Sequence, residues 1–170
     1  GMIGLYLAID RPELVHSLVL AASCAYMDET GLATMRYWAS LADRCDSVGI
    51  FRDFFRRVYT VPDMTALAAI ENSATEEQCR RFGILARACE AFDCRDELAR
   101  VPCPTLVIGA EKDLVLGETA ERNTAELIGC EYILCEGYAH AACDEAPYYK
   151  DLLREFFDRT YAPAQNGEVT

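Results

Sequence analysis

The chain has 170 residues, the length of one ordinary domain, and 52% of them are apolar, which is enough to form a hydrophobic core. Its 28 acidic residues outnumber 16 Lys and Arg residues, so the formal net charge is -12. This balance argues against a nucleic-acid or anionic-membrane partner, because both attract basic patches. We interpret the acidity as a contribution to solubility.

Neither a membrane span nor a zinc site is expected. No apolar run reaches the roughly 20 residues of a membrane-spanning helix. Residues 2–9 are apolar but lack the basic segment and the cleavage site of a signal peptide, so we expect a cytoplasmic protein. The nine cysteines form no Cys-x-x-Cys pair, and only two histidines accompany them. We interpret them as small core residues in a reducing compartment.

The amino-terminal residues predict a buried helix followed by a buried strand. Residues 2–11 are apolar on nearly every side, and Arg11 ends the helix because it precedes Pro12. Residues 17–22 form a short continuous apolar run, which is typical of a strand covered on both faces of a parallel sheet.

Residues 26–98 show helical patterns and no strand signal. Apolar residues recur at helical spacing in several stretches, and Thr75 with Gln78 begins the last of them as a capping box. We therefore predict a helical insertion with elements at residues 29–45, 48–59, 62–70 and 75–92.

Strands and helices alternate again from residue 99. The patterns predict strands at 104–109 and 130–137, helices at 117–128 and 146–161, and a disordered tail at 162–170. In the closing helix we expect inward-facing apolar side chains at Tyr149, Leu152, Leu153, Phe156 and Phe157. The alternation predicts an α/β fold with a small parallel sheet of about three strands and flanking helices.

Two loops carry the candidate catalytic residues, Asp113 and His140. Each loop follows the carboxyl end of a predicted strand, where open α/β sheets place their active sites. A carboxylate beside a histidine fixes its tautomer and stabilises the imidazolium that forms when the ring takes a proton. The alternative for His140 is a capping or surface role. His16 lies at the opposite end of its strand and is interpreted as structural.

The chain resembles the carboxyl-terminal two-thirds of an α/β-hydrolase over about residues 1–160. GMIGLYLAIDRPELVHSLVLAAS is similar to the segment that follows the nucleophile elbow, G-x-S-x-G. VPCPTLVIGAEKD resembles the strand and loop of the acid, EGYAHA the histidine loop, and LLREFF the last helix. The resemblance implies that Asp113 and His140 are the acid and the base of an esterase- or enol-lactonase-like site for a small ester-like substrate.

The resemblance also implies a domain organisation. Residues 1–25 and 99–161 would form a partial hydrolase core, and residues 26–98 would form its helical cap. Gly1 stands at the last glycine of the elbow, or it remains from an expression tag. The nucleophilic serine and the oxyanion loop are then missing, so we expect this truncated chain to be inactive alone.

Other chemically capable residues have simpler interpretations. Ser23 and Cys24 follow the first strand and Cys143 lies near His140, but the family places no nucleophile at these positions. Asp144 and Glu145 are interpreted as the amino-terminal cap and dipole partners of the last helix, and Asp93 and Asp96 as loop caps. Aromatic residues of the helical insertion either pack its core or line a substrate pocket: Trp38, Phe51, Phe54 and Phe55.

Three functional hypotheses follow. The first is an acyl hydrolase with an incomplete catalytic triad. The second is a non-catalytic remnant that forms a homodimer or larger assembly through residues 2–11 and 17–22, because an unpaired strand edge invites another chain. The third is a hydrolase completed by a separate chain that supplies the amino-terminal half. No cofactor is expected in any of them, since the sequence has no glycine-rich phosphate loop.

Overall fold

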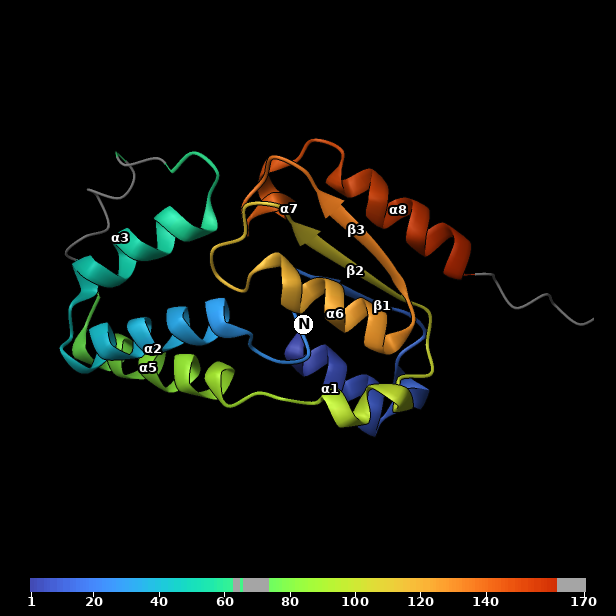
Figure 1. Cartoon of the computed structure of the whole chain (residues 1–170), viewed down its shortest axis with the longest axis horizontal. Helices are drawn as coiled ribbons and strands as arrows, with labels where there is room; N and C mark the ends of the chain where they lie inside the picture. Colours follow the sequence, from blue (N-terminus) through green and yellow to red (C-terminus); the bar gives the residue numbers. More distant parts are fainter. Residues whose placement is uncertain (63–64, 66–73, 162–170) are drawn as a thin grey trace, which may run out of the picture.

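The centre of the molecule is a parallel three-stranded sheet (Figure 1). The computed structural model describes residues 1–62, 65 and 74–161. The strands β1 (Leu18–Ala21), β2 (Thr105–Ala110) and β3 (Glu131–Cys135) lie in that order, with Leu20 opposite Val107 and Ile108 opposite Ile133. Every residue of β2 is buried, as a strand covered on both faces requires. The expected α/β fold class is confirmed.

Helices cover both faces of the sheet. On one face, α1 (Met2–Asp10) and α6 (Glu118–Ile128) pack over Leu20 and Val107. On the other face, the short helix α7 (Ala142–Glu145) and α8 (Tyr149–Thr160) pack over Ile108. Val107 and Ile108 face opposite helices because successive side chains of a strand alternate between the two faces.

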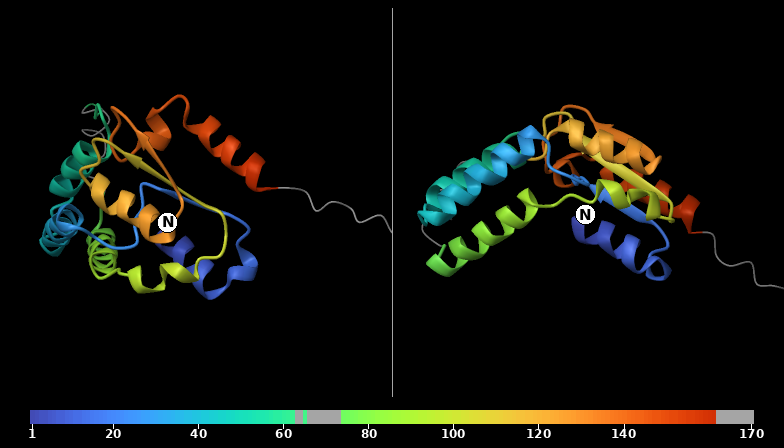
Figure 2. Two further views of the ribbon diagram at one scale, coloured as in Figure 1. Left: turned by 45° about the vertical axis from the view of Figure 1, so that its right-hand side comes forward. Right: turned by 60° about the horizontal axis from the view of Figure 1, so that its bottom comes forward.

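Three helices lie beside the sheet rather than on it (Figure 2). They are α2 (Glu29–Asp43), α3 (Ser47–Val58) and α5 (Glu76–Glu90), and they lie within the expected helical insertion. The helix expected at 62–70 falls almost entirely outside the described residues, as does the tail at 162–170. The division of the chain into a core and a cap stays a prediction.

Some local expectations are wrong. Phe157 is 43% exposed, whereas Phe156 is buried, because neighbouring positions of a helix point about 100° apart. Asp144 and Glu145 do not begin the last helix: they lie in α7, and α8 starts only at Tyr149. Two 3₁₀ helices, at Pro12–Leu14 and Arg95–Arg100, were not expected from the sequence.

Among the described residues, no helix combines the length and the apolar character needed to cross a bilayer.

The capping box of α5 is present and gives a first prediction. Thr75 Oγ1 accepts the N–H of Gln78 at 3.2 Å, and Gln78 Oε1 accepts the N–H of Thr75 at 2.7 Å. Thr75→Ala should lower the free energy of unfolding by about 1 kcal/mol, because it removes the oxygen that caps the helix. Urea unfolding followed by circular dichroism measures this. Thr75→Ser keeps the oxygen and should lose less; equal losses would show that the hydroxyl is not the stabilising group.

Candidate active site

Asp113 lies in the turn that follows β2, at the carboxyl edge of the sheet. Its side chain is fully buried, and Oδ1 accepts the backbone N–H groups of Val115 at 2.7 Å and Leu116 at 3.0 Å. These two hydrogen bonds compensate the burial of the carboxylate and fix its orientation. The second oxygen, Oδ2, therefore has a defined direction.

His140 meets that second oxygen. Its Nδ1 atom lies 2.7 Å from Asp113 Oδ2, and the imidazole is about one quarter exposed, at 24%. A carboxylate only accepts hydrogen bonds, so Nδ1 carries the proton and donates it. This leaves Nε2 as the ring nitrogen that can take a proton from another group. The structure thus brings the two sequence-predicted residues together; their catalytic role stays a prediction.

The loops that follow β2 and β3 are also joined by two hydrogen bonds, one between backbone groups and one from a backbone N–H to a carboxylate. Lys112 N–H donates to Tyr138 C=O at 2.8 Å, and Gly137 N–H donates to Glu111 Oε2 at 2.7 Å. Gly137 has a φ of +83°, a conformation that residues with a Cβ atom rarely adopt. These contacts bring the residues that follow β2 and β3 to the same edge, as expected for neighbouring parallel strands.

A second carboxyl group, Glu121, lies buried near this edge. Glu121 is on α6 with no exposed surface, and its Oε2 accepts the N–H of Ala110 at 3.3 Å. Burial, followed by the charge of Asp113, raises the pKa of the Glu121 carboxyl to about 9. Within the described part of the chain, Glu121 Oε1 and the Tyr132 hydroxyl have no hydrogen-bond partner.

Glu121 is not among the sequence-predicted site residues, although its position in the sequence carries a signal. Glu121 is three residues before Thr124 and four before Ala125, and all three are buried on one stripe of α6. A carboxyl residue on the core-facing stripe of a helix is unusual and indicates a buried acid.

This burial predicts a pH dependence of stability. The unfolded chain releases the Glu121 proton near the ordinary glutamate pKa of about 4.3, whereas the folded chain keeps it until higher pH. Between pH 5 and 8 the folded chain therefore binds the extra proton, and stability falls with pH by at most about 1.4 kcal/mol per unit. Glutamine does not titrate, so Glu121→Gln should lack this fall. The free energy of unfolding of Glu121→Gln minus that of the unsubstituted chain, measured by urea unfolding, should therefore increase as pH rises.

The matched control is Glu126→Gln, on the exposed side of the same helix. It should leave the pH dependence of the unsubstituted chain in place. A difference between Glu121→Gln and the unsubstituted chain that stays constant from pH 5 to 8 would contradict the buried, protonated carboxyl.

The other candidate nucleophiles, Ser23, Cys24 and Cys143, differ in how deeply they are buried. Ser23 is 5% exposed and Cys24 is fully buried, and burial raises the pKa of the Cys24 thiol to about 12. A buried thiol that holds its proton is a poor nucleophile. Cys143 is exposed and lines a small cavity with His140, but burial of its sulfur raises the pKa of that thiol as well.

His16 is exposed just before the amino end of β1, far from the carboxyl edge.

The helical insertion contains an apolar cavity of about 240 Å³ between α3 and α5. Its lining includes Phe51, Phe54 and Phe82 but neither Asp113 nor His140. Trp38 donates to Asp53 at 2.7 Å and packs against Phe54 and Phe82, as a core residue of these helices would.

Across the described residues, no three His, Cys, Asp or Glu side chains gather in a way that could hold a metal ion.

Comparison with known proteins gives the class of fold. The sequence matches no protein-family model. The structure is similar to MGS-M2, an alpha/beta hydrolase enzyme from a Medee basin deep-sea metagenome library, with a TM-score of 0.82 and 20% identity over 96% of this chain and 64% of that one. It is similar to the enol-lactonase from Burkholderia xenovorans LB400, with a TM-score of 0.77 and 18% identity over 92% and 62% of the two chains. The chain therefore has an α/β-hydrolase fold, and the expected resemblance is confirmed.

A curated relative agrees with this class. A protein of Rhizobium rhizogenes (strain K84 / ATCC BAA-868) whose full name is "Putative carbamate hydrolase RutD" is 28% identical over 148 residues. The match covers 83% of this chain and 56% of that protein. The chain thus spans between about half and two thirds of the length of the hydrolases that it matches.

Proposed function

We propose that the chain forms the acid–histidine side of an acyl-hydrolase site that acts on small esters, lactones or related compounds. The observation that carries this proposal is the 2.7 Å contact between Asp113 Oδ2 and His140 Nδ1 at the carboxyl edge of a parallel sheet. The neighbours named above include an enol-lactonase and a carbamate hydrolase. Lactones, carbamates and esters share an acyl carbon that a nucleophile can attack.

In this mechanism the two side chains move and hold one proton. His140 Nε2 accepts the proton of an attacking hydroxyl group and later gives it to the leaving group. Asp113 holds the ring in the required tautomer and stabilises the imidazolium that forms in between. The attacking hydroxyl and the oxyanion-binding N–H groups are proposed to come from a segment outside these 170 residues.

The position of Gly1 supports this arrangement. A Cβ atom on Gly1 would lie 1.9 Å from Ser23 Oγ, so Gly1 packs directly against the residues that follow β1. The carboxyl ends of β1 and β2 lie at the same edge because the strands are parallel. A nucleophile elbow joined to Gly1 would therefore reach the edge that carries Asp113 and His140.

An ester assay tests the proposal. The 170-residue chain alone should not measurably hydrolyse short-chain nitrophenyl esters, since losing the nucleophile of such a triad costs on the order of 10⁶ in turnover. Adding a segment with a G-x-S-x-G elbow, encoded directly upstream or in a neighbouring reading frame, should restore turnover. His140→Ala should abolish the restored activity, and Asp113→Asn should lower it by about 10⁴. Turnover by the chain alone that His140→Ala abolishes would contradict the external nucleophile.

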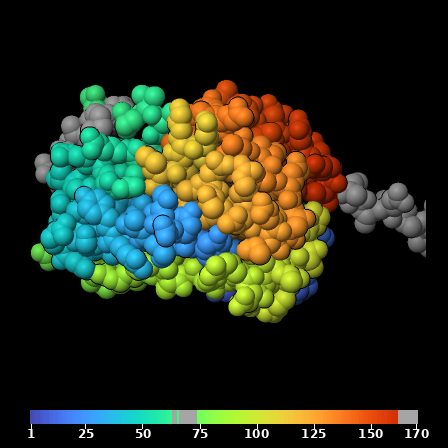
Figure 3. All heavy atoms as spheres, in the orientation of Figure 1, coloured from blue at the N-terminus to red at the C-terminus, as the bar shows by residue number. Residues whose placement is uncertain are grey.

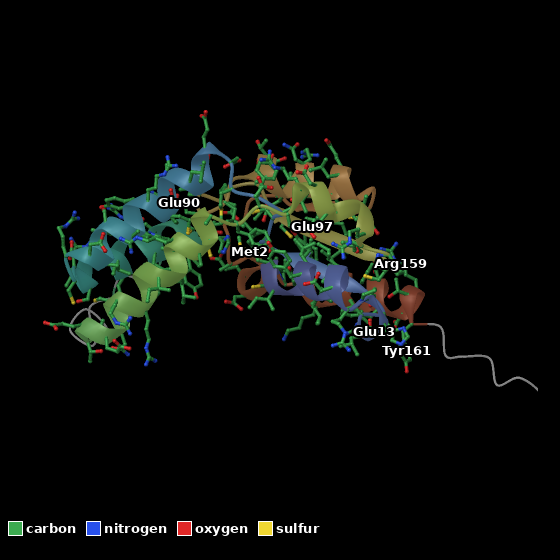
Figure 4. All side chains as sticks on the ribbon, turned by 90° about the horizontal axis from the view of Figure 1, so that it is seen from below. Met2, Glu13, Glu90, Glu97, Arg159 and Tyr161 are labelled. Atoms are coloured by element: carbon green, nitrogen blue, oxygen red, sulfur yellow. The ribbon has the colours of Figure 1, made fainter. Side chains whose placement is uncertain are left out.

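A second candidate function is a non-catalytic module that self-associates, and an exposed apolar surface favours it. On α1 and the 3₁₀ helix after it, Ile3, Leu7 and Leu14 are 85%, 42% and 59% exposed. Figure 4 looks onto this side, with Met2 at the start of α1 and Glu13 in the 3₁₀ helix that follows. Among the described strands, β1 pairs only with β2, so its outer edge is open. Open edges and apolar patches favour association with another chain.

Sedimentation velocity tests self-association through this surface. The unsubstituted chain should sediment as a dimer or larger at micromolar concentration, and Ile3→Lys should shift it toward the monomer by placing a charge in the interface. Ile84→Lys is the matched control, because Ile84 is 52% exposed on α5, outside this surface. A monomeric unsubstituted chain would refute this candidate, as would equal effects of the two substitutions.

A further inference from the structure

The backbone on both sides of His140 is held by residues at the end of α3. Ala139 N–H donates to Thr60 Oγ1 at 2.9 Å, and Ala141 N–H donates to Val58 C=O at 2.7 Å. The segment from β3 to α7 contains turns and no strand or helix, so its N–H groups need partners elsewhere. The helical insertion supplies two of these partners, one on each side of His140.

Thr60 is itself fixed by an acidic side chain. Its N–H lies 3.1 Å from each carboxylate oxygen of Glu145, and its hydroxyl donates to Glu145 Oε2 at 2.8 Å. The Thr60 oxygen thus donates one hydrogen bond to Glu145 and accepts another from Ala139. Serine could make both bonds, whereas valine, which has nearly the same shape as threonine, could make neither.

The same end of α3 also holds the acid loop. Arg57 Nη1 donates to Leu114 C=O at 3.0 Å and to Thr34 Oγ1 at 3.2 Å, and Thr34 Oγ1 donates to the same carbonyl at 3.2 Å. Asp53 Oδ2 accepts from Arg57 Nε at 2.7 Å and so fixes the guanidinium. Leu114 directly follows Asp113, so this contact fixes the backbone next to the acid.

We infer that Arg57 to Thr60, here named the α3 strap, positions both members of the Asp113–His140 pair, with Arg57 and Thr60 as its positioning residues. The inference rests on the proposed function, because it assigns the strap to the same site. Neither residue needs to touch a substrate. The strap holds the backbone beside each functional side chain, and small displacements of such groups lower catalytic rates steeply.

The strap is tested by exchange of the His140 Nδ1 proton with solvent, measured by NMR on the full chain with ¹⁵N-labelled histidine. The sequence has only two histidines, so the exposed His16 ring serves as an internal reference. Thr60→Val should speed exchange of the His140 proton about tenfold or more, because it removes both hydrogen bonds of the Thr60 hydroxyl. Thr60→Ser should exchange like the unsubstituted chain.

Two further variants separate positioning from a general loss of stability. Thr75→Ala weakens α5 without touching either loop and should leave the His140 exchange unchanged. Glu145→Gln removes one acceptor of Thr60 and should speed exchange in the same direction, so it decides the matter if Thr60→Val does not fold. Unchanged exchange in whichever of the two variants folds would overturn the inference, and so would an equal acceleration in Thr75→Ala.

This measurement also separates the strap from the proposed function, because it needs no substrate. If the chain completed with an elbow segment is inactive while Thr60→Val accelerates exchange, the proposed function fails and the strap stands. If Thr60→Val leaves exchange unchanged while His140-dependent turnover is present, the strap fails and the proposed function stands.

Discussion

The Asp113 carboxylate is the constraint on which the site depends. It is fully buried, and a buried charge is tolerated only when its oxygens are bound. One oxygen takes two backbone N–H groups of its own turn, and the other takes His140 Nδ1. The turn therefore sets the direction of the carboxylate, and the carboxylate sets the tautomer of the ring. The remaining nitrogen, Nε2, is thereby the one that can accept a proton.

The fold brings three separate parts of the sequence to this carboxylate. Strand β2 delivers Asp113 and β3 delivers His140, while the helical insertion contacts both loops from the side. In the space-filling view the insertion and the sheet layer form one continuous surface (Figure 3). The insertion thus lies against both loops. Its hydrogen bonds help to determine where the two loops lie.

Residues with local signals were predictable from the sequence, and residues defined by distant contacts were not. Asp113 and His140 each follow an apolar run, so their common edge follows from the rules for parallel sheets. Thr60 follows a helix and not a strand, so the rules for parallel sheets do not place it. Its partners Ala139 and Glu145 are 79 and 85 residues away in the sequence. Glu145 was expected to cap the last helix because only its neighbours in sequence were visible. Phe157 directly follows Phe156, and the apolar pattern does not show which of the two faces the sheet; Phe156 is buried and Phe157 is exposed.

The tautomer of His140 is the most direct test of this account. In the chain with ¹⁵N-labelled histidine, the ring-nitrogen shifts of neutral His140 should show the proton on Nδ1, and Asp113→Ala should remove this preference. His16, which is exposed, should not change. A proton on Nε2 in the unsubstituted chain, or a tautomer unaffected by Asp113→Ala, would contradict the claim that Asp113 orients His140 for proton transfer.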